Sequence, residues 1–71
     1  MKMITQESIR KELVAAIKQS GLSQMQIAEK LGIKQPTVSE YVTGKSMPAL
    51  DTFANLCRVL DLDANEILCL K

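Results

Sequence analysis

Two cysteines, Cys57 and Cys69, are the side chains of this 71-residue chain best suited to ligate a metal or act as nucleophiles. They stand twelve positions apart and no histidine accompanies them, so they do not complete a tetrahedral zinc site. The lack of histidine also excludes His-based acid–base and nucleophilic catalysis. We therefore expect no metal, no cofactor and no enzymatic activity, and two free thiols in a reducing, cytoplasmic compartment.

Hydrogen-bonding side chains gather instead in and just before one short segment, residues 35–43. The segment reads as a helix, because Pro36 is tolerated in a first turn and Gly44 is suited to end it. Val38 and Tyr41 are its candidates for burial. The ammonium, amide, hydroxyl and carboxylate groups come from Lys34, Gln35, Thr37, Ser39 and Glu40.

The elements that hold this segment are predicted to be helices as well. Hydrophobic residues make up 46% of the chain and charged residues 24%, a mixture typical of a single globular domain, residues 1–71. Tyr41 and Phe53 are the two aromatic residues, so the core is built from aliphatic side chains, which favours packed helices over a sheet. The longest apolar run, residues 13–17, is far shorter than the roughly 20 residues that span a membrane.

Two helices are predicted before the polar segment. Apolar residues in 5–20 recur at helical spacing, and Thr5 is placed to cap the start. The next helix, residues 23–31, opens with a capping box in which Ser23 and Gln26 each bond the other's backbone amide.

Two more helices are predicted after it. Residues 50–60 form the fourth helix, and Asp63 with Glu66 reads as a capping box that starts a fifth helix reaching about Leu70. The consecutive apolar residues 67–70 cannot all face one core, so some of them are exposed or meet a partner. The fourth helix has a strong apolar stripe of Leu50, Phe53, Leu56, Cys57 and Leu60.

The most informative stretch is residues 22–41, LSQMQIAEKLGIKQPTVSEY. Two short helices are joined by a tight turn at Gly32, and the small Ala28 lies where they would cross. This is the pattern of a helix-turn-helix, at about residues 23–43. The angle between the helices is set by the apolar residues Leu22, Ile27, Leu31, Ile33 and Val38.

The chain resembles the lambda-repressor-like (Cro/cI-type, or XRE) helix-turn-helix family over about residues 6–70. The resemblance implies an all-α, five-helix DNA-binding domain whose third helix lies in the major groove. The matching pattern is Leu22-Ser23-Gln24, Ile27-Ala28, Leu31-Gly32-Ile33, Val38-Ser39, Gly44-Lys45 and Pro48, followed by Leu50, Phe53, Leu56, Leu60 and Ile67-Leu68.

The resemblance also implies roles for individual residues. Those expected at or beside base edges are Lys34, Gln35, Pro36, Thr37, Ser39 and Glu40. Those expected at phosphates are Ser23, Gln24, Thr43, Lys45 and Ser46. The chemistry is compatible, because Gln35 can pair with adenine, Lys34 with guanine and Glu40 with cytosine.

Three positions depart from the family's pattern. Lys34 and Ala49 stand where a Ser or Thr cap is usual, before the third and fourth helices. Val42 stands where family members often carry an acidic residue. These departures affect the stability of helix ends more than function.

The leading hypothesis is a sequence-specific transcriptional regulator of bacterial or phage type, a dimeric repressor that reads an inverted repeat. One helix-turn-helix reads only a few base pairs, and two copies about 34 Å apart read an inverted repeat. The apolar tail is the candidate dimer surface, formed by Val59, Leu62, Leu68, Cys69 and Leu70.

A protein-interaction module is the alternative hypothesis. Nine basic residues against eight acidic ones give a net charge of +1, which does not by itself indicate nucleic-acid binding. An antitoxin or small phage regulator of this fold would have a protein partner, a toxin or an antirepressor. The two hypotheses are compatible, because antitoxins of this fold often also bind DNA.

Overall fold

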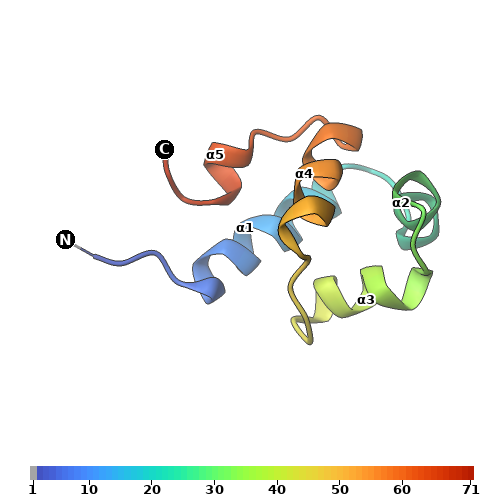
Figure 1. Cartoon of the computed structure of the whole chain (residues 1–71), viewed down its shortest axis with the longest axis horizontal. Coiled ribbons are helices and arrows are strands. Elements are labelled where there is room, and N and C mark those ends of the chain that lie inside the picture. The colour runs from blue at the N-terminus through green and yellow to red at the C-terminus, as the bar shows by residue number, and fades with distance from the viewer. Residues whose placement is uncertain (1) are drawn as a thin grey trace.

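The computed structural model describes residues 2–71, and within them it contains five α-helices and no strand (Figure 1). The prediction of an all-α, five-helix fold is confirmed. None of these helices is long and apolar enough to cross a membrane. The helices are α1 (Gln6–Gln19), α2 (Gln24–Leu31), α3 (Gln35–Thr43), α4 (Leu50–Val59) and α5 (Ala64–Ile67).

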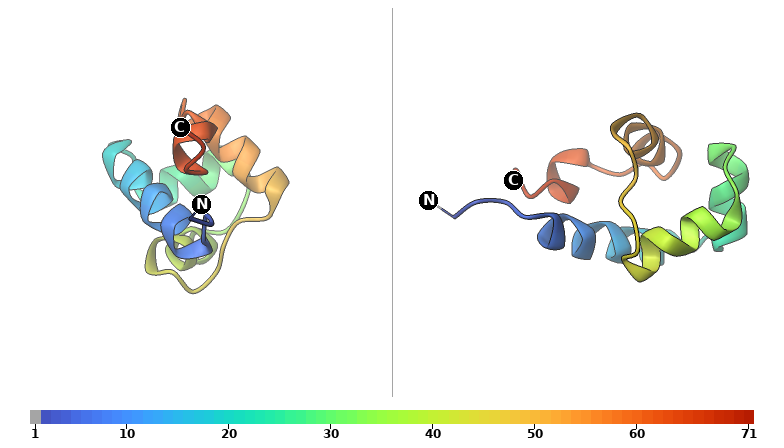
Figure 2. Two further views of the ribbon diagram at one scale, coloured as in Figure 1. Left: turned by 90° about the vertical axis from the view of Figure 1, so that its left-hand side faces the viewer. Right: turned by 60° about the horizontal axis from the view of Figure 1, so that its bottom comes forward.

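The long helix α1 is the element against which much of the molecule packs. Thr5 caps its start, where the Thr5 hydroxyl oxygen accepts a hydrogen bond from the Ser8 amide at 3.1 Å. Leu13 and Ile17 turn their side chains into the core. Helices α3 and α5, far apart in the sequence, both contact α1 (Figures 1 and 2).

The helix-turn-helix is formed by α2 and α3, which pack mainly against each other. The predicted capping box is present: the Gln26 amide donates to the Ser23 hydroxyl at 3.1 Å, and the Ser23 amide donates to the Gln26 side chain at 2.9 Å. Gly32 ends α2 with a φ of +70°, in the left-handed region that glycine adopts without strain. The right-hand view of Figure 2 shows the bend between the two helices.

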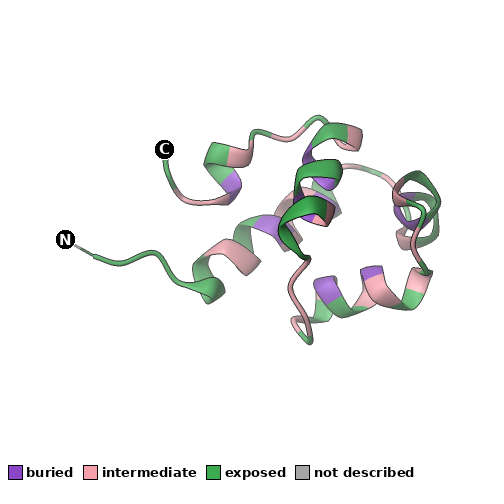
Figure 3. Cartoon of the chain, in the orientation of Figure 1, coloured by how far each residue is buried: buried purple, intermediate pink, exposed green. Residues whose placement is uncertain are grey.

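The core lies among the five helices, and every helix contributes to it (Figure 3). Its most deeply buried members, Leu13, Ile27, Val38 and Leu56, each expose less than 2% of their surface. They come from α1, α2, α3 and α4 respectively, so the core fixes the position of the helix-turn-helix relative to the scaffold. The remaining cluster members are Ile17, Ala28, Phe53, Cys57 and Ile67.

One prediction for α4 is wrong. Leu50 was expected on the inward stripe, yet it exposes 86% of its surface. Leu50 is the first residue of α4, and its neighbours Ala49 and Asp51 are exposed too. The stripe therefore becomes buried only from Phe53 onward, because the first turn of α4 faces solvent.

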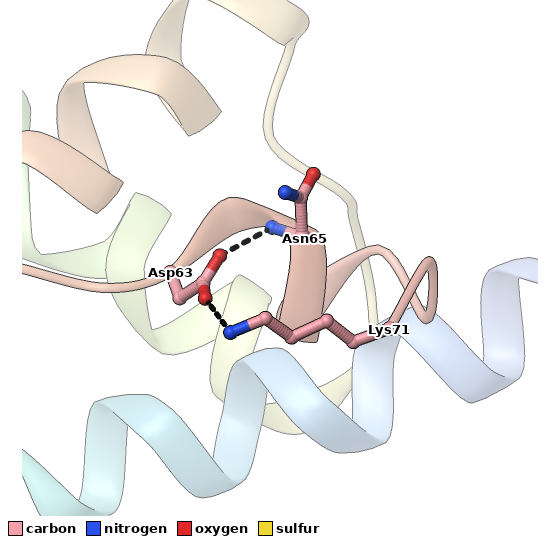
Figure 4. Close-up of polar contacts among 3 residues, drawn as sticks. All are labelled: Asp63, Asn65 and Lys71. Carbon is pink, nitrogen blue, oxygen red and sulfur yellow. Dashed lines mark hydrogen bonds and ion pairs between the residues drawn. The ribbon is translucent and has the colours of Figure 1, made fainter.

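Two predictions for α5 also need correction. The helix ends at Ile67 rather than near Leu70. Asp63 does cap its start, but its carboxylate accepts from the Asn65 amide at 2.9 Å, one residue earlier than in a capping box (Figure 4). The other carboxylate oxygen accepts from the Lys71 ammonium, which ties the end of the chain to this cap.

Candidate nucleic-acid interface

One side of α3 is built to face outward. Val38 and Tyr41 are buried in the protein, whereas Pro36, Glu40 and Thr43 are exposed. Residues spaced four and three apart lie on the same side of a helix, so these three form one outward face. Of the other residues expected at base edges, Lys34 is exposed, whereas Gln35, Thr37 and Ser39 are half-buried.

A hydrogen bond joins the first residues of the two helices in the motif. The Gln35 side-chain amide donates to the side-chain carbonyl of Gln24 at 2.8 Å, and both side chains are half-buried. The bond leaves the amide of Gln24 free to donate. It also leaves Gln35 with one N–H donor and its carbonyl acceptor, the pair of groups that matches an adenine edge.

The start of α2 offers further donors. The Ser23 hydroxyl oxygen accepts from the Gln26 amide, so its own proton remains free to donate. The capping box occupies the amides of Ser23 and Gln26. The amides of Gln24 and Met25 have no partner within the helix, and the helix dipole places positive charge at the same end. Ser23 and Gln24 therefore lie where an anionic group is favoured.

The loop after α3 contains the remaining expected phosphate contacts. The Thr43 hydroxyl donates to the Ser39 carbonyl oxygen at 3.0 Å, and the Ser46 hydroxyl donates to the Glu40 carboxylate at 3.4 Å. Both hydroxyl protons are thus engaged inside the chain. The Lys45 side chain is exposed, so its ammonium is the donor of this loop that is ready for a phosphate.

Sequence reasoning missed Arg10, which reaches this loop from α1. Its Nη1 donates to the Gly44 carbonyl oxygen at 3.3 Å. The contact places a cation at the C-terminal end of α3, where the helix dipole is negative. The two residues are 34 positions apart and no spacing pattern relates them, so the sequence carried no signal for this contact.

The electrostatics of the face are mixed. Lys34 and Lys45 are exposed cations at the two ends of α3, and Glu40 adds one exposed carboxylate between them. Burial, and then the nearby Glu40 and Asp51 carboxylates, raise the pKa of the Tyr41 phenol above its ordinary value. Tyr41 therefore stays neutral near pH 7 and contributes no charge.

The predicted dimer surface is only partly available. Leu62 and Leu68 pack against the protein's own core, and Val59 and Cys69 are half-buried. Leu70 is the tail residue that is well exposed, at 63%.

The two cysteines remain separate in the fold. Both thiols are free, and burial together with Asp63 raises the pKa of Cys57, which favours the protonated thiol. Within residues 2–71 no group of three or more His, Cys, Asp or Glu side chains is arranged to hold a metal ion.

Comparison with known proteins identifies the family to which the motif belongs. The model of the helix-turn-helix family matches residues 13–67. Two curated relatives, each called Antitoxin HigA1 and coming from two strains of Mycobacterium tuberculosis, are 41% identical over 56 residues. The match covers 79% of this chain and 38% of each relative, so the chain spans under two fifths of their length. No solved structure matches the chain.

Proposed function

The chain belongs to the lambda-repressor-like (XRE) helix-turn-helix family of DNA-binding proteins, and from this premise we propose that it is a sequence-specific transcriptional regulator. In this proposal α3 lies in the major groove of duplex DNA. The outward face of α3 reads base edges, and the start of α2 and the loop after α3 hold the two flanking phosphate backbones.

The Gln24–Gln35 hydrogen bond is the observation that carries the proposal. It joins a residue expected at a phosphate to one expected at a base. A Gln35 side chain already held by Gln24 loses less conformational freedom when it pairs with a base. The bond also couples the phosphate contact to the base contact, so the position of the backbone determines where Gln35 can reach.

The free donors divide the phosphate contacts into two groups. Ser23, Gln24 and Lys45 have donors available, and we propose that they contact phosphate directly. Thr43 and Ser46 donate within the chain. A phosphate contact from either hydroxyl therefore requires its present bond to break, which makes these two the weaker contacts of the proposed set.

Selection of bound duplexes from a random DNA pool at about physiological salt tests the function. Substitutions then test the roles. Gln35→Ala removes about 1–3 kcal/mol of discrimination at one base pair. Lys45→Ala weakens binding to all duplexes alike and lowers the dependence on salt, since it removes a phosphate contact.

Lys30→Ala is the matched control for Lys45→Ala, because Lys30 is an exposed cation of α2 that stands outside the proposed set of DNA contacts. It should leave affinity unchanged. A folded chain that enriches no sequence would contradict the proposed function. Equal losses for Gln35→Ala on every duplex would contradict the assignment of Gln35 to a base.

We further propose that the regulator is a dimeric repressor that reads an inverted repeat. One α3 contacts too few base pairs to select a site in a genome, and a two-fold pair doubles the sequence that is read. Half-sites whose centres lie about 10 base pairs apart are the expected outcome of the selection.

A second candidate function rests on the named relatives. Proteins called Antitoxin HigA1 share 41% identity with this chain. We propose as the alternative that the chain also binds and neutralises a protein toxin. Co-expression with the product of a neighbouring gene tests this: the partner should arrest growth alone and be neutralised by the chain. A neighbouring product that is harmless, or that stays toxic with the chain present, would count against it.

A further inference from the structure

Leu50 is the most exposed large apolar side chain within residues 2–71. It stands at the rim of an apolar groove of about 220 Å³ where the start of α1, the loop before α4 and the segment after α5 come together. The side chains that matter here are Ile9 of α1, Met47 and Pro48 of the loop, and Leu68. An exposed apolar side chain that adjoins an apolar groove forms a contiguous apolar surface, which is the kind of surface that marks an interaction site.

We propose that this surface, Leu50 with its groove, is where two copies of the chain pair, and that Leu50 of each copy fills the groove of the other. The proposal rests on the dimer of the proposed function and names its surface. A two-fold interface must be complementary to itself, because the same patch is used by both partners. Here the projecting side chain and the hollow lie next to each other on one patch, as such an interface requires.

The charge of the groove favours a second copy as its occupant. Its lining contains no charged side chain, and Gln6 is its only polar member. The hollow between α1 and α3 differs, because Arg10, Lys11 and Lys18 lie at its edge. An uncharged groove matches an equally uncharged surface, and the buried centres of protein interfaces are depleted in charge. A second copy supplies such a surface through Leu50.

The surrounding residues extend the apolar patch. Ile4 and Met3 stand two and three residues before Gln6, which lines the groove. Both side chains are exposed. A stable pair buries about 800 Å² on each partner, roughly a sixth of the 5039 Å² of accessible surface of this chain. In the proposed pair the groove and Leu50 would form the apolar centre of an interface of this size.

The position of the groove also suits the proposed function. Met47 and Pro48 follow directly on Lys45 and Ser46 in one loop. Pairing through this loop would therefore fix the two sets of phosphate contacts relative to each other. The two α3 helices of the pair would then be held at a constant spacing, which reading an inverted repeat requires.

Sedimentation equilibrium of the full chain and two variants tests the surface. Leu50→Glu should raise the dimer dissociation constant on the order of 100-fold or more, since two leucines lose their burial and two charges would be buried. The variant should still fold, because Leu50 is exposed and an acidic residue in a first turn suits the helix dipole. Leu50→Ala should also raise the dimer dissociation constant, although it adds no charge.

Leu70→Glu is the matched control, because Leu70 is an exposed tail residue outside the groove lining. It should change the dissociation constant only a few-fold. A Leu50→Glu variant that pairs like the unchanged chain overturns the proposal, as does a larger loss from Leu70→Glu. A chain that is monomeric both in solution and on DNA also overturns it, and leaves the groove to a different protein.

Measurements on DNA separate this proposal from the proposed function. With a selected duplex, Leu50→Glu should keep its affinity for a single half-site and lose cooperativity between two half-sites. Cooperative binding by Leu50→Glu would place the pairing surface elsewhere and leave the DNA-binding function intact. A chain that pairs through Leu50 and binds no duplex would support the pairing surface and contradict the proposed DNA-binding function.

Discussion

Gly44 and Gly32 allow a matched test of how α3 is anchored to α1. Both residues end a helix of the motif in the left-handed conformation, with φ of +82° and +70°. A Cβ atom at Gly32 would meet nothing within 4 Å. At Gly44 it would lie 2.9 Å from Nη1 of Arg10 and 3.1 Å from Cδ of the same side chain. Substitution by alanine thus adds the same backbone strain at both positions and a steric conflict at one.

The expected costs follow from these contacts. The left-handed conformation costs an alanine about 1–2 kcal/mol, and the stiffer unfolded chain returns about 0.4–1 kcal/mol, so Gly32→Ala should lower the free energy of unfolding by about 1 kcal/mol. Gly44→Ala must also displace the guanidinium of Arg10 and weaken its 3.3 Å bond to the Gly44 carbonyl. This bond is long and only partly buried, so its loss adds about 0.5–1.5 kcal/mol.

Urea denaturation of the single and double variants measures these differences. Gly44→Ala should be less stable than Gly32→Ala by about 1 kcal/mol in the unchanged chain. In an Arg10→Ala background the clash and the bond are absent, so the two glycine substitutions should then cost the same. Equal costs in the unchanged chain, or a difference that persists without Arg10, would refute the role given to this contact.

Two further predictions concern helix ends. Ala49 precedes α4 without a side-chain cap, so Ala49→Ser should raise the free energy of unfolding by about 1 kcal/mol, measured by denaturation. The Lys71 ammonium and the Asn65 amide hold the pKa of Asp63 below its ordinary 3.8. A lowered pKa in the folded state stabilises the protein above the ordinary value, and this contribution is lost as the pH falls through the folded value. Asp63→Asn keeps the cap but removes the charge, so its stability deficit should be present near pH 7 and shrink as the pH falls below the ordinary pKa and through the folded-state pKa of Asp63. A deficit independent of pH would contradict this.

Local signals predicted the helix starts well, because capping needs only residues close in sequence. Thr5 and Ser23 cap α1 and α2 as expected, and Gly44 ends α3 as expected. The same locality explains the error at Leu50. Apolar spacing shows which side of a helix a residue lies on, but it does not show whether another element covers that side. The first turn of α4 has no cover within residues 2–71.

The sequence predicted which residues belong to the candidate site, but it did not predict the hydrogen bonds between them. Gln24 and Gln35 could each be placed at a helix start from the sequence. Their hydrogen bond depends on the angle between α2 and α3, which is set by packing in the core. The role of Arg10 could not be predicted from the sequence for the same reason, because its bond to Gly44 depends on how α1 crosses the end of α3.

The small number of cations on the proposed DNA face links the two proposals. Lys34 and Lys45 are its exposed cations, and Glu40 offsets part of their charge. Release of counterions from phosphates supplies much of the affinity of DNA-binding proteins, and it grows with the number of phosphates neutralised. Lys45 is the cation assigned to a phosphate, so the salt dependence should be about −1 in log–log slope for one copy and about −2 for a pair. A single copy is therefore a weak binder, and affinity for a site has to come from joining two copies. The apolar groove beside Leu50 is where the chain has the means to join them.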